Sequence, residues 1–379
     1  MNISDVRKKY IQHFNRIPEC FYAPGRVNLM GDHTDYNNGL VLPMAINMGT
    51  LIAISKSNNN IISIYSENMD EKFSFDISEM NLKSSPQWVN YIFGITSLLR
   101  ENEYIINGLD IYISSNLPMG AGLSSSASLS IALCYAIFTI HDFFIDKNQI
   151  ITLAQLVEHR YVGTKCGIMD QTICTHAKKQ KLLQLDCETN HIKQIDFNTN
   201  ETSILICDTG IKHELCSSEY NIRKNECDEA AALLDIASLR NLSERELEQE
   251  KNNLPDTLYK RCLHVVTENN RVKSISDAIE LGDWNTAGRV MRDSHYSLKN
   301  HYEVSCHELD FLVESSYGIQ GIYGGRMTGG GFGGCAVFII QNDLLPSIKN
   351  TLSKLYLERF DRCLKCFSSS AYDGVSKVS

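Results

Sequence analysis

Four side chains that can bind or neutralise polar groups lie close together near the N-terminus. The segment Pro24–Tyr36 reads PGRVNLMGDHTDY and contains Arg26, Asp32, His33 and Asp35. The apolar residues on both sides have the pattern of buried segments. Unpaired charges are costly to bury, so this cluster needs partners, a ligand or a metal. Carboxylates accept hydrogen bonds and an imidazole donates or accepts them, which suits the hydroxyls of a sugar. The alternative is a surface loop in which the aspartates only form turns.

A second segment, Leu117–Ala127, has the composition of a loop that binds phosphate. It reads LPMGAGLSSSA and lies between a strand-like pattern and an apolar run. A strand, a turn of small residues and the start of a helix present backbone N–H groups to an anion. Gly120 and Gly122 let the backbone approach that anion, and the hydroxyls of residues 124–126 can reach phosphate or Mg²⁺. No G-K-[ST] follows, so it is not a Walker A loop. A plain glycine turn with serine capping is the alternative.

A third segment, Gly324–Gly334, is the richest in glycine. It reads GGRMTGGGFGG, and Gly329, Gly331 and Gly334 satisfy G-x-G-x-x-G. A dinucleotide-binding fingerprint should open a helix after the first strand of a βαβ unit. Here the glycines precede a strand and lie near the C-terminus. We therefore interpret them as a backbone-rich loop that lines a site, with a simple hairpin turn as the alternative.

A fourth segment, Glu158–Gln171, places two carboxylates at helix ends. It reads EHRYVGTKCGIMDQ. Glu158 ends an apolar helical pattern that Gly163 breaks, and Gly167 opens the next helix with Asp170 in its first turn. The helix dipole stabilises the ionised form of a carboxylate at that position. Aspartates are common at helix starts for this reason alone, so a purely structural role stays open at this point.

Strand-like and helix-like patterns alternate between these motifs, which indicates a mixed α+β or α/β fold. In residues 109–113, for example, apolar side chains occupy every second position, as in a strand with one buried face. Strands are predicted at 51–55, 61–65, 109–113 and 335–340, and helices at 149–161, after residue 166 and at 221–234. The polar, turn-rich stretch 189–202 is the predicted main domain boundary.

The composition indicates a globular protein that acts on small molecules. The 379 residues are 43% hydrophobic and 21% charged. A total of 36 Lys and Arg against 45 Asp and Glu gives a net charge of −9. That charge argues against a nucleic-acid-binding surface, which needs clustered positive side chains. At about 150 residues per domain, the length corresponds to two or three domains.

The cysteines and the first residues indicate a reduced, cytoplasmic protein. Thirteen cysteines, an odd number, are spread along a chain too long to need disulfide stapling. The first residues mix charges where a signal peptide needs an apolar stretch. The longest apolar run, Leu129–Ile140, is shorter than the about 20 residues that span a bilayer. Cys363 and Cys366 form a C-x-x-C pair with no second pair nearby, so we interpret them as ordinary thiols. We expect no membrane and no nucleic-acid partner.

The four segments together resemble the galactokinases, which belong to the GHMP family of small-molecule kinases. The resemblance runs the length of the chain, in the family's order and at its spacing. Beyond the first motif and the phosphate loop, it rests on CGIMDQ at 166–171, SEYN at 218–221, RMTGGGFGG at 326–334, WVNY at 88–91 and YEVSC at 302–306. The first motif and GIMDQ are specific to galactokinases, whereas the two glycine-rich loops are shared across GHMP kinases.

The resemblance implies a two-domain α+β fold with mixed β-sheets packed against helices and an active site in the cleft between the domains. We expect an N-terminal domain of residues 1–195, with the sugar-binding motif, the phosphate loop and Asp170. A C-terminal domain of residues 196–379 carries the third motif. The last residues, about 20 of them, are expected to pack back on the N-terminal domain. The family leans towards monomers, and we expect one here.

The resemblance also implies a reaction, the ATP-dependent phosphorylation of the C1 hydroxyl of galactose with Mg²⁺ as cofactor. It implies that Asp170 is the catalytic base, that Arg26 stabilises the transition state, and that Ser126 and Glu158 hold Mg²⁺. The implied sugar-binding residues are Asp32, His33, Thr34, Asp35, Gly167 and Tyr220. The implied ATP-binding residues are Ser66, Trp88, Gly120, Ala121, Gly122, Leu123, Ser124, Ser125 and Ser126, with Trp88 stacking on adenine.

One departure from the family pattern leaves the sugar open. Asp32 stands where galactokinases usually have a glutamate near the sugar's C6 hydroxyl, and its shorter side chain sets the carboxylate back by one methylene. A kinase for a derivative such as N-acetylgalactosamine therefore stays an alternative. So does a kinase of the same superfamily for mevalonate or homoserine, although the first motif speaks against it. A galactokinase-like sensor without catalysis is the alternative of another class. Such sensors lose residues from the phosphate loop, and Ser125, Ser126 and Ala127 are all present here.

Overall fold

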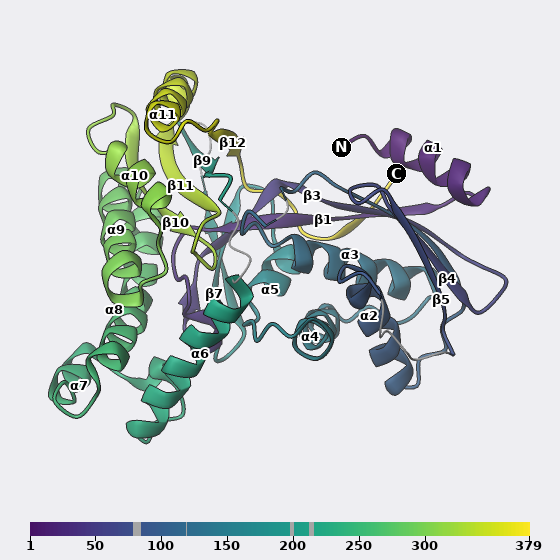
Figure 1. The fold of residues 1–379 in the computed structure, drawn as a ribbon, viewed down its shortest axis with the longest axis horizontal. Coiled ribbons are helices and arrows are strands. Elements are labelled where there is room, and N and C mark those ends of the chain that lie inside the picture. Colours follow the sequence, from purple (N-terminus) through teal and green to yellow (C-terminus); the bar gives the residue numbers. More distant parts are fainter. Residues whose placement is uncertain (79–84, 119, 198–200, 212–215) are drawn as a thin grey trace.

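The molecule has two halves, and each is built around one large β-sheet packed against helices (Figure 1). The computed structural model describes every residue except 79–84, 119, 198–200 and 212–215, and for residues 216–218 it describes only the helix to which they belong. A third, smaller sheet lies between the two halves.

The first sheet has six strands in the order β13-β1-β3-β6-β4-β5. Its neighbours are antiparallel except β4 and β6, which run parallel. Its strands are β1 (Glu19–Asn28), β3 (Pro43–Lys56), β4 (Ile61–Ser66), β5 (Glu71–Asp76), β6 (Leu109–Ser115) and β13 (Ser376–Val378). Strands β1 and β3 are long enough to reach from this half towards the other (Figure 1).

Both faces of this sheet are covered. The alternating side chains of β6 explain how: Leu109 and Ile111 face a core shared with α3, whereas Tyr112 packs with Tyr10 of the N-terminal helix. The helices around the sheet are α1 (Ile3–Phe14), α2 (Val89–Glu101), α3 (Ser125–Ile140), α4 (Lys147–Val157) and α5 (Met169–His176). Helix α1 lies alone on its face, and the other four lie opposite (Figure 1).

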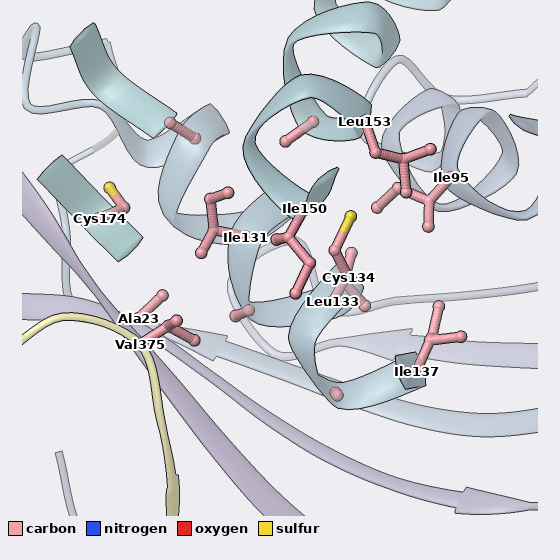
Figure 2. Close-up of a cluster of buried hydrophobic side chains, with 14 of the residues drawn as sticks. Ala23, Ile95, Ile131, Leu133, Cys134, Ile137, Ile150, Leu153, Cys174 and Val375 are labelled. Atoms are coloured by element: carbon pink, nitrogen blue, oxygen red, sulfur yellow. The ribbon is translucent and has the colours of Figure 1, made fainter. Parts of the chain in front are cut away.

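Helix α3 is the centre of the N-terminal core. Its residues are apolar on nearly all sides, which is the pattern of a helix surrounded by protein. Ile131 and Cys134 are fully buried and lie among Ile150 of α4, Cys174 of α5 and Val375 (Figure 2). Val375 comes from the end of the chain, so the C-terminal tail contributes to the core of the N-terminal half.

The second half contains a four-stranded antiparallel sheet in the order β10-β11-β9-β12. Its strands are β9 (Thr202–Asp208), β10 (Ile322–Thr328), β11 (Cys335–Gln341) and β12 (Lys365–Ser369). Its helices are α6 (Cys216–Leu233), α7 (Glu244–Gln249), α8 (Asp256–Glu280), α9 (Trp284–Ser297), α10 (His307–Ser315) and α11 (Leu345–Phe360). Short helical turns are η1 (Asp35–Asn37), η2 (Glu158–Val162), η3 (Leu239–Asn241), η4 (Leu298–Tyr302) and η5 (Asn342–Leu344).

The two halves share a core. The third sheet, in the order β2-β7-β8, consists of β2 (Leu40–Val41), β7 (Lys181–Asp186) and β8 (His191–Asp196). A buried apolar cluster joins Met30, from the first motif, to Ile204 of β9 and Val337 of β11. The predicted boundary at residues 195/196 falls before the last residue of β8 and stays a prediction. Residues 198–200 of the predicted boundary stretch lie outside the described part. Strand β13 pairs with β1, as Val378 does with Cys20.

The strands and helices predicted from the pattern are confirmed, with one refinement. The helix predicted at 149–161 consists of α4, which ends at Val157, and the π-helical turn η2. The cysteines whose side chains are described are free thiols. Cys363 is exposed, and the sulfur of Cys366 lies 3.4 Å from that of Cys207. In the described part of the chain, no helix has the length and the hydropathy needed to cross a membrane.

Candidate active site

One cavity collects residues from all four motifs. Its volume is about 350 Å³, and it lies where the loop after β1, the starts of α3 and α5 and the β10–β11 loop meet. The predicted site residues that line it are Arg26, Asp32, His33, Asp35, Gly120, Gly122, Leu123, Ser124, Ser125, Ser126, Glu158, Gly167, Asp170 and Tyr220. Of the predicted residues, Thr34, Ser66, Trp88 and Ala121 do not line it.

Arg26 and Asp170 form a two-point ion pair at the wall of this cavity. The Nε atom of Arg26 is 2.7 Å from Oδ1 of Asp170, and its Nη2 atom is 2.8 Å from Oδ2. Arg26 follows a register shift in β1, which re-aims its side chain. Burial by itself would lower the pKa of the guanidinium, but the charge and hydrogen bonds of Asp170 outweigh it and raise that pKa. The arginine therefore stays charged.

The same arginine connects β1 to the phosphate-loop segment. Its backbone N–H donates to the carbonyl of Leu123 at 3.1 Å, and its Nη1 donates to the carbonyl of Gly122 at 2.5 Å. The hydroxyl of Ser124 donates to the Asp170 carboxylate. Ser124 is at the N-cap position of α3 but makes no capping hydrogen bond with its side chain. Its hydroxyl is thus used by the site and not by the helix end.

The third motif packs against the phosphate-loop segment. Gly120 and Gly122 have φ values of 74° and 72°, in the left-handed region that glycine adopts without strain. A Cβ atom at Gly329 would lie 3.0 Å from the Gly122 carbonyl, and one at Gly334 would lie 3.1 Å from the Ala121 carbonyl. The motif is the loop of the β10–β11 hairpin and also lines the cavity, so both readings of it hold. A strand follows it, which excludes the dinucleotide fingerprint.

Glu158 is a buried carboxylate beside Ser126 at the wall of the cavity. It is 4% exposed and forms no ion pair with any residue that the structure describes. Its pKa is raised to about 7, because burial and the negative charge of Asp170 outweigh the lowering effect of hydrogen bonds from Ser126 and Tyr91. Among the described side chains, no group of three or more His, Cys, Asp and Glu residues could hold a metal by itself. A cation here would take most of its ligands from elsewhere, which is how Mg²⁺ binds beside phosphate.

Asp35 and Gly167 face each other at the opposite end of the cavity. A Cβ atom at Gly167 would lie 2.2 Å from Oδ2 of Asp35, so only glycine allows this approach. Burial raises the pKa of Asp35 to about 7, and the charge of Asp170 raises it too. The carboxylate lacks a cationic partner in the described part of the chain and can accept hydrogen bonds from a ligand.

His33 and Tyr220 complete this end of the cavity. The Nδ1 atom of His33 is 2.8 Å from the hydroxyl of Tyr36, and the ring of Tyr220 lies 5.6 Å from the His33 ring. Burial lowers the pKa of His33 far below its usual value, so the imidazole is neutral. Burial likewise raises the pKa of Tyr220, which keeps its hydroxyl protonated.

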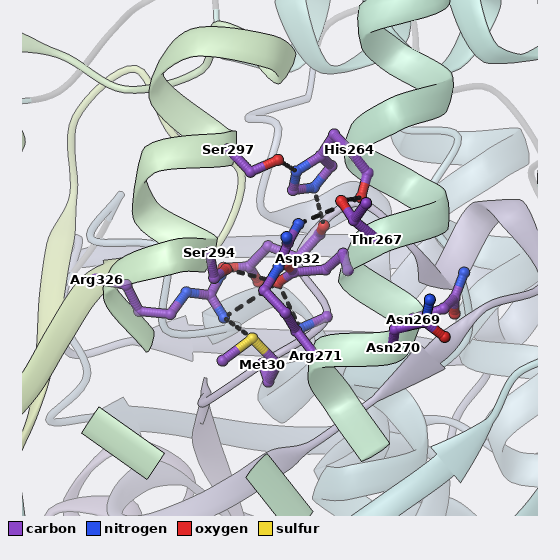
Figure 3. Close-up of polar contacts among 12 residues, drawn as sticks. Met30, Asp32, His264, Thr267, Asn269, Asn270, Arg271, Ser294, Ser297 and Arg326 are labelled. Carbon is purple, nitrogen blue, oxygen red and sulfur yellow. Dashed lines mark hydrogen bonds and ion pairs between the residues drawn. The ribbon is translucent and has the colours of Figure 1, made fainter. Parts of the chain in front are cut away.

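Asp32 lines the cavity with both carboxylate oxygens already in use. Oδ1 accepts from Nδ2 of Asn28 at 2.8 Å, and Oδ2 accepts from Nη2 of Arg326 (Figure 3). Burial raises the pKa of Asp32 to about 6, against the lowering effect of Arg326. Thr34 is fully buried outside the cavity, and its hydroxyl is shared between the carbonyls of Gly31 and Leu40. The structure therefore assigns Thr34 to the shape of the turn and not to the cavity wall.

The residues predicted to contact adenine lie elsewhere. Ser66 ends β4 and is 5% exposed. The indole Nε1 of Trp88 donates to Glu71 at 2.9 Å, and the ring packs on the N-terminal core. Neither residue lines the cavity, whose walls are built mainly by the four motifs. Ala121 is buried, and its carbonyl is part of the contact between the two glycine-rich loops.

Comparison with known protein families agrees with the motifs. A galactokinase galactose-binding signature matches residues 8–56, the GHMP kinase N-terminal domain matches residues 90–178, and the GHMP kinase C-terminal domain matches residues 275–357. A galactokinase of Roseiflexus sp. strain RS-1 is 35% identical over 384 residues, which cover 100% of this chain and 98% of the relative. The chain belongs to the galactokinase family. A galactokinase of Thermotoga neapolitana is 40% identical over 94% of this chain and 99% of its own length.

Comparison with solved structures also supports the galactokinase fold. The galactokinase of Lactococcus lactis, solved in complex with galactose, superimposes with a TM-score of 0.95 at 32% identity and covers 99% of this chain. The match covers 100% of the Lactococcus lactis chain. The mevalonate kinase of Methanococcus jannaschii matches with a TM-score of 0.67 at 20% identity and therefore shares the fold alone. The expected two-domain α+β GHMP kinase fold is confirmed, and the chain is a kinase.

Sequence reasoning missed the residues that lie behind Asp32, at the wall of the cavity. Asn28, Glu268 and Arg326 are fully buried and surround Asp32. Arg326 belongs to the third motif, which the sequence identifies. Its partner Asp32 lies 294 residues earlier in the chain, so the sequence does not indicate the pair. Nothing in the helical pattern around Glu268 distinguishes it from a solvated glutamate.

Proposed function

We propose that this chain transfers the γ-phosphoryl group of ATP to the C1 hydroxyl of galactose, producing galactose 1-phosphate and ADP. The observation that carries the proposal is the two-point contact between Arg26 and Asp170 at the junction of the phosphate-loop segment and the sugar-binding motif. The galactokinase relatives and the galactose complex of the Lactococcus lactis enzyme support galactose as the acceptor.

Asp170 is proposed as the group that accepts the proton of the sugar hydroxyl. An anomeric hydroxyl is a weak nucleophile, and a carboxylate within hydrogen-bond reach can take its proton as the bond to phosphorus forms. Arg26 and Ser124 hold both oxygens of Asp170 from one side. The carboxylate is therefore oriented before substrate binds, and orientation contributes more here than proton affinity.

Arg26 is proposed to neutralise charge on the transferring phosphoryl group. Phosphoryl transfer requires positioning and charge stabilisation more than covalent chemistry by the protein. The guanidinium cannot be deprotonated, and its Nη1 atom already contacts the Gly122 carbonyl of the phosphate-loop segment. Residues 120–126 are proposed to hold the triphosphate through backbone N–H groups and hydroxyls. Ser66 and Trp88 stay proposed nucleotide contacts beyond the cavity.

Ser126 and Glu158 are proposed to hold Mg²⁺. Glu158 is buried, has no ion pair within the described part of the chain and has a pKa raised to about 7, so a cation beside it would offset its charge. One hydroxyl and one carboxylate are a typical protein share for Mg²⁺ next to phosphate. When bound, Mg²⁺ neutralises charge on phosphate oxygens.

His33, Asp35, Gly167 and Tyr220 are proposed to bind the sugar, with Asp32 behind them. Neutral imidazole, a carboxylate and a phenol supply both donors and acceptors for hydroxyl groups. Asp35 lies close enough to Asp170 that, after burial, the negative charge of Asp170 is the next cause that raises the pKa of Asp35. A sugar hydroxyl between them would replace that repulsion by hydrogen bonds.

The test is ADP release by purified protein with Mg²⁺ and ATP, measured across galactose, 2-deoxygalactose, N-acetylgalactosamine, glucose, arabinose and mevalonate. We expect the highest kcat/KM with galactose and background rates with glucose and mevalonate. A higher kcat/KM with N-acetylgalactosamine would reassign the acceptor. Background rates with every compound would contradict the kinase proposal and favour the sensor alternative.

A further inference from the structure

The turn that carries Asp32 and His33 has an unusual backbone. Gly31 has a φ of 94° and His33 a φ of 65°, so two of three consecutive residues are in the left-handed region. A non-glycine residue in that region is disfavoured unless its surroundings hold it there. A Cβ atom at Gly31 would lie 2.4 Å from the carbonyl of Leu40, which packs the turn tightly against the next strand.

Helix α8 holds this turn from the other half of the molecule. The backbone N–H of Gly31 donates to Oε1 of Glu268 at 3.0 Å. The backbone carbonyl of Asp32 is 3.0 Å from Nε2 of His264, and the backbone N–H of Leu40 donates to Oδ1 of Asn269 at 2.7 Å. Three residues from less than two turns of one helix thus bind the backbone on both sides of the proposed sugar-binding residues. Figure 3 shows His264 beside Asp32.

His264 has a defined tautomer. Burial lowers its pKa to about 4, so the ring is neutral at physiological pH and carries one N–H. A carbonyl can only accept, so that N–H is on Nε2 and points at Asp32. Nδ1 then accepts from the hydroxyl of Ser297, which lies at 2.9 Å.

Glu268 is the centre of the arrangement. It is completely buried. Oε1 accepts from Gly31 and from the hydroxyl of Ser294 at 2.8 Å and lies 3.7 Å from Nη1 of Arg326, and Oε2 accepts from Nε of Arg271 at 2.6 Å. Burial by itself would raise the pKa of Glu268, but the charges of Arg271 and Arg326 lower it to about 2. The carboxylate is ionised at every pH at which the enzyme would work.

Arg326 completes the link to the cavity. Its side chain is fully buried and bridges Glu268 to the carboxylate of Asp32, which lines the cavity. Glu268 therefore acts on Asp32 in two ways, through the backbone of Gly31 and through the guanidinium of Arg326. It does not line the cavity itself.

We propose that Glu268 is a positioning residue for substrate, which fixes the Gly31–His33 turn and the Asp32 carboxylate in the conformation that binds the sugar. This proposal rests on the proposed function for the identity of the sugar. The role of Glu268 in fixing the turn does not depend on which sugar binds. Each half of the molecule then builds part of one sugar site: the first motif comes from the N-terminal half, and Tyr220 and the supporting helix α8 come from the other.

The test variant is Glu268→Gln, which keeps the shape but removes the charge. An amide has one acceptor oxygen and one donor nitrogen. Whichever way it turns, its NH₂ group faces either Arg271 or the donors of Gly31 and Ser294, so one set of contacts is lost. The control is Ile275→Val, which removes one methylene on the same helix at a buried position whose apolar side chain makes no hydrogen bond to the turn.

Two measurements are made on both variants and on the wild type. Titration calorimetry with galactose is expected to give a Kd at least tenfold higher for Glu268→Gln, with the KM for ATP within twofold of wild type. Hydrogen exchange followed by mass spectrometry is expected to give faster exchange in residues 29–40 of Glu268→Gln only. In Ile275→Val, both readouts should match the wild type at a temperature where each protein is folded.

The outcomes separate this proposal from the proposed function. Exchange in residues 29–40 that is equal in Glu268→Gln and wild type, or equally raised in both variants, would overturn the positioning role. A wild type that binds galactose without phosphorylating it would contradict the proposed function and leave the expected loss of binding in Glu268→Gln intact. The exchange measurement needs no substrate, so it decides the positioning role even if the acceptor is another sugar.

Discussion

Arg26 and Asp170, 144 residues apart in the chain, contact each other through two parallel N–H···O hydrogen bonds of 2.7 and 2.8 Å. This geometry fixes the plane of the carboxylate relative to the guanidinium. Since Arg26 also binds the carbonyls of two phosphate-loop residues, the pair sets the distance between the proposed base and the proposed triphosphate site.

Replacing Asp170 by Asn should remove turnover and keep the fold. The amide is of the same size but cannot take a proton from the sugar hydroxyl, and one of its ends faces Arg26 with the wrong polarity. We expect kcat to fall by about a thousandfold or more, measured as ADP release at saturating galactose. The control is Asp256→Asn, an exposed aspartate in the first turn of α8, which should keep full activity. A kcat for Asp170→Asn within tenfold of wild type would exclude Asp170 as the base.

Replacing Glu158 by Gln should weaken the use of Mg²⁺. We expect the Mg²⁺ concentration for half-maximal rate to rise at least tenfold, because a neutral amide offsets less of the cation's charge. The raised pKa of about 7 adds a pH signature. As the pH falls from 8 to 6, a proton competes with Mg²⁺ at Glu158, so the half-saturating Mg²⁺ concentration should rise in the wild type.

The matched control for that experiment is Glu188→Gln, at an exposed glutamate outside the cavity. Galactose is kept saturating so that Asp35, whose pKa is also about 7, does not dominate the profile. In Glu158→Gln the pH dependence of the Mg²⁺ requirement should disappear. Equal Mg²⁺ curves for Glu158→Gln and wild type at both pH values would show that another residue holds the cation.

Replacing Asp35 by Asn should stabilise the sugar-free protein at pH 8 while weakening galactose binding. Burial raises the pKa of Asp35 from 3.8 to about 7, so between these values the folded state holds a proton that the unfolded state has lost. The stability associated with that proton is complete below pH 4 and lost as the pH rises through 7. We expect Asp35→Asn to gain roughly 1–3 kcal/mol in the free energy of unfolding at pH 8 and nothing at pH 4.

Urea denaturation at the two pH values measures that gain. The control Asp293→Asn changes an aspartate whose side chain is 56% exposed and should shift neither value. Asp35→Asn should at the same time raise the galactose Kd, since the amide presents a donor where the carboxylate offered two acceptors. An unchanged free energy of unfolding at pH 8 would mean that the buried charge is compensated in the free protein.

Replacing Asp32 by Glu should lower the KM for galactose. Galactokinases usually have the longer residue here, and in this chain the Asp32 carboxylate is held back by Asn28 and Arg326. One added methylene moves the carboxylate from these two partners towards the cavity that it already lines. Initial rates over a range of galactose concentrations measure the effect. An unchanged or raised KM would show that Asn28 and Arg326 fit the site to the shorter side chain.

The sequence was sufficient to predict the motifs and the elements that carry them, but not the side-chain contacts that hold the motifs in place. Asp170 at a helix start, the strand before the phosphate loop and the glycine hairpin follow from local patterns, because each depends on a few neighbouring residues. Thr34 lies inside the first motif, and its hydroxyl binds the backbone carbonyls of Gly31 and Leu40. The stacking of Trp88 on adenine stays a prediction, and the sequence did not indicate that its indole donates to Glu71. The hydrogen-bond partner of such a side chain depends on which group lies nearest in the folded structure, and a local pattern does not show that.

The support for the sugar-binding turn shows the same limit more strongly. Glu268 lies 237 residues after Gly31, and its neighbours in α8 have the mixed pattern of any amphipathic helix. Only the packing of α8 against the first motif turns this glutamate into a buried acceptor of three hydrogen bonds that also pairs with Arg326. Long-range contacts of this kind leave no periodic signal in a single sequence.

The central claim is phosphoryl transfer to the anomeric hydroxyl of galactose, and ³¹P NMR of the reaction products tests it most directly. Wild-type protein with Mg²⁺, ATP and galactose should produce ADP and an equal amount of one phosphomonoester whose phosphorus couples to the anomeric proton of the sugar. Inorganic phosphate in place of that ester, an ester on another carbon, or no consumption of ATP would contradict the account.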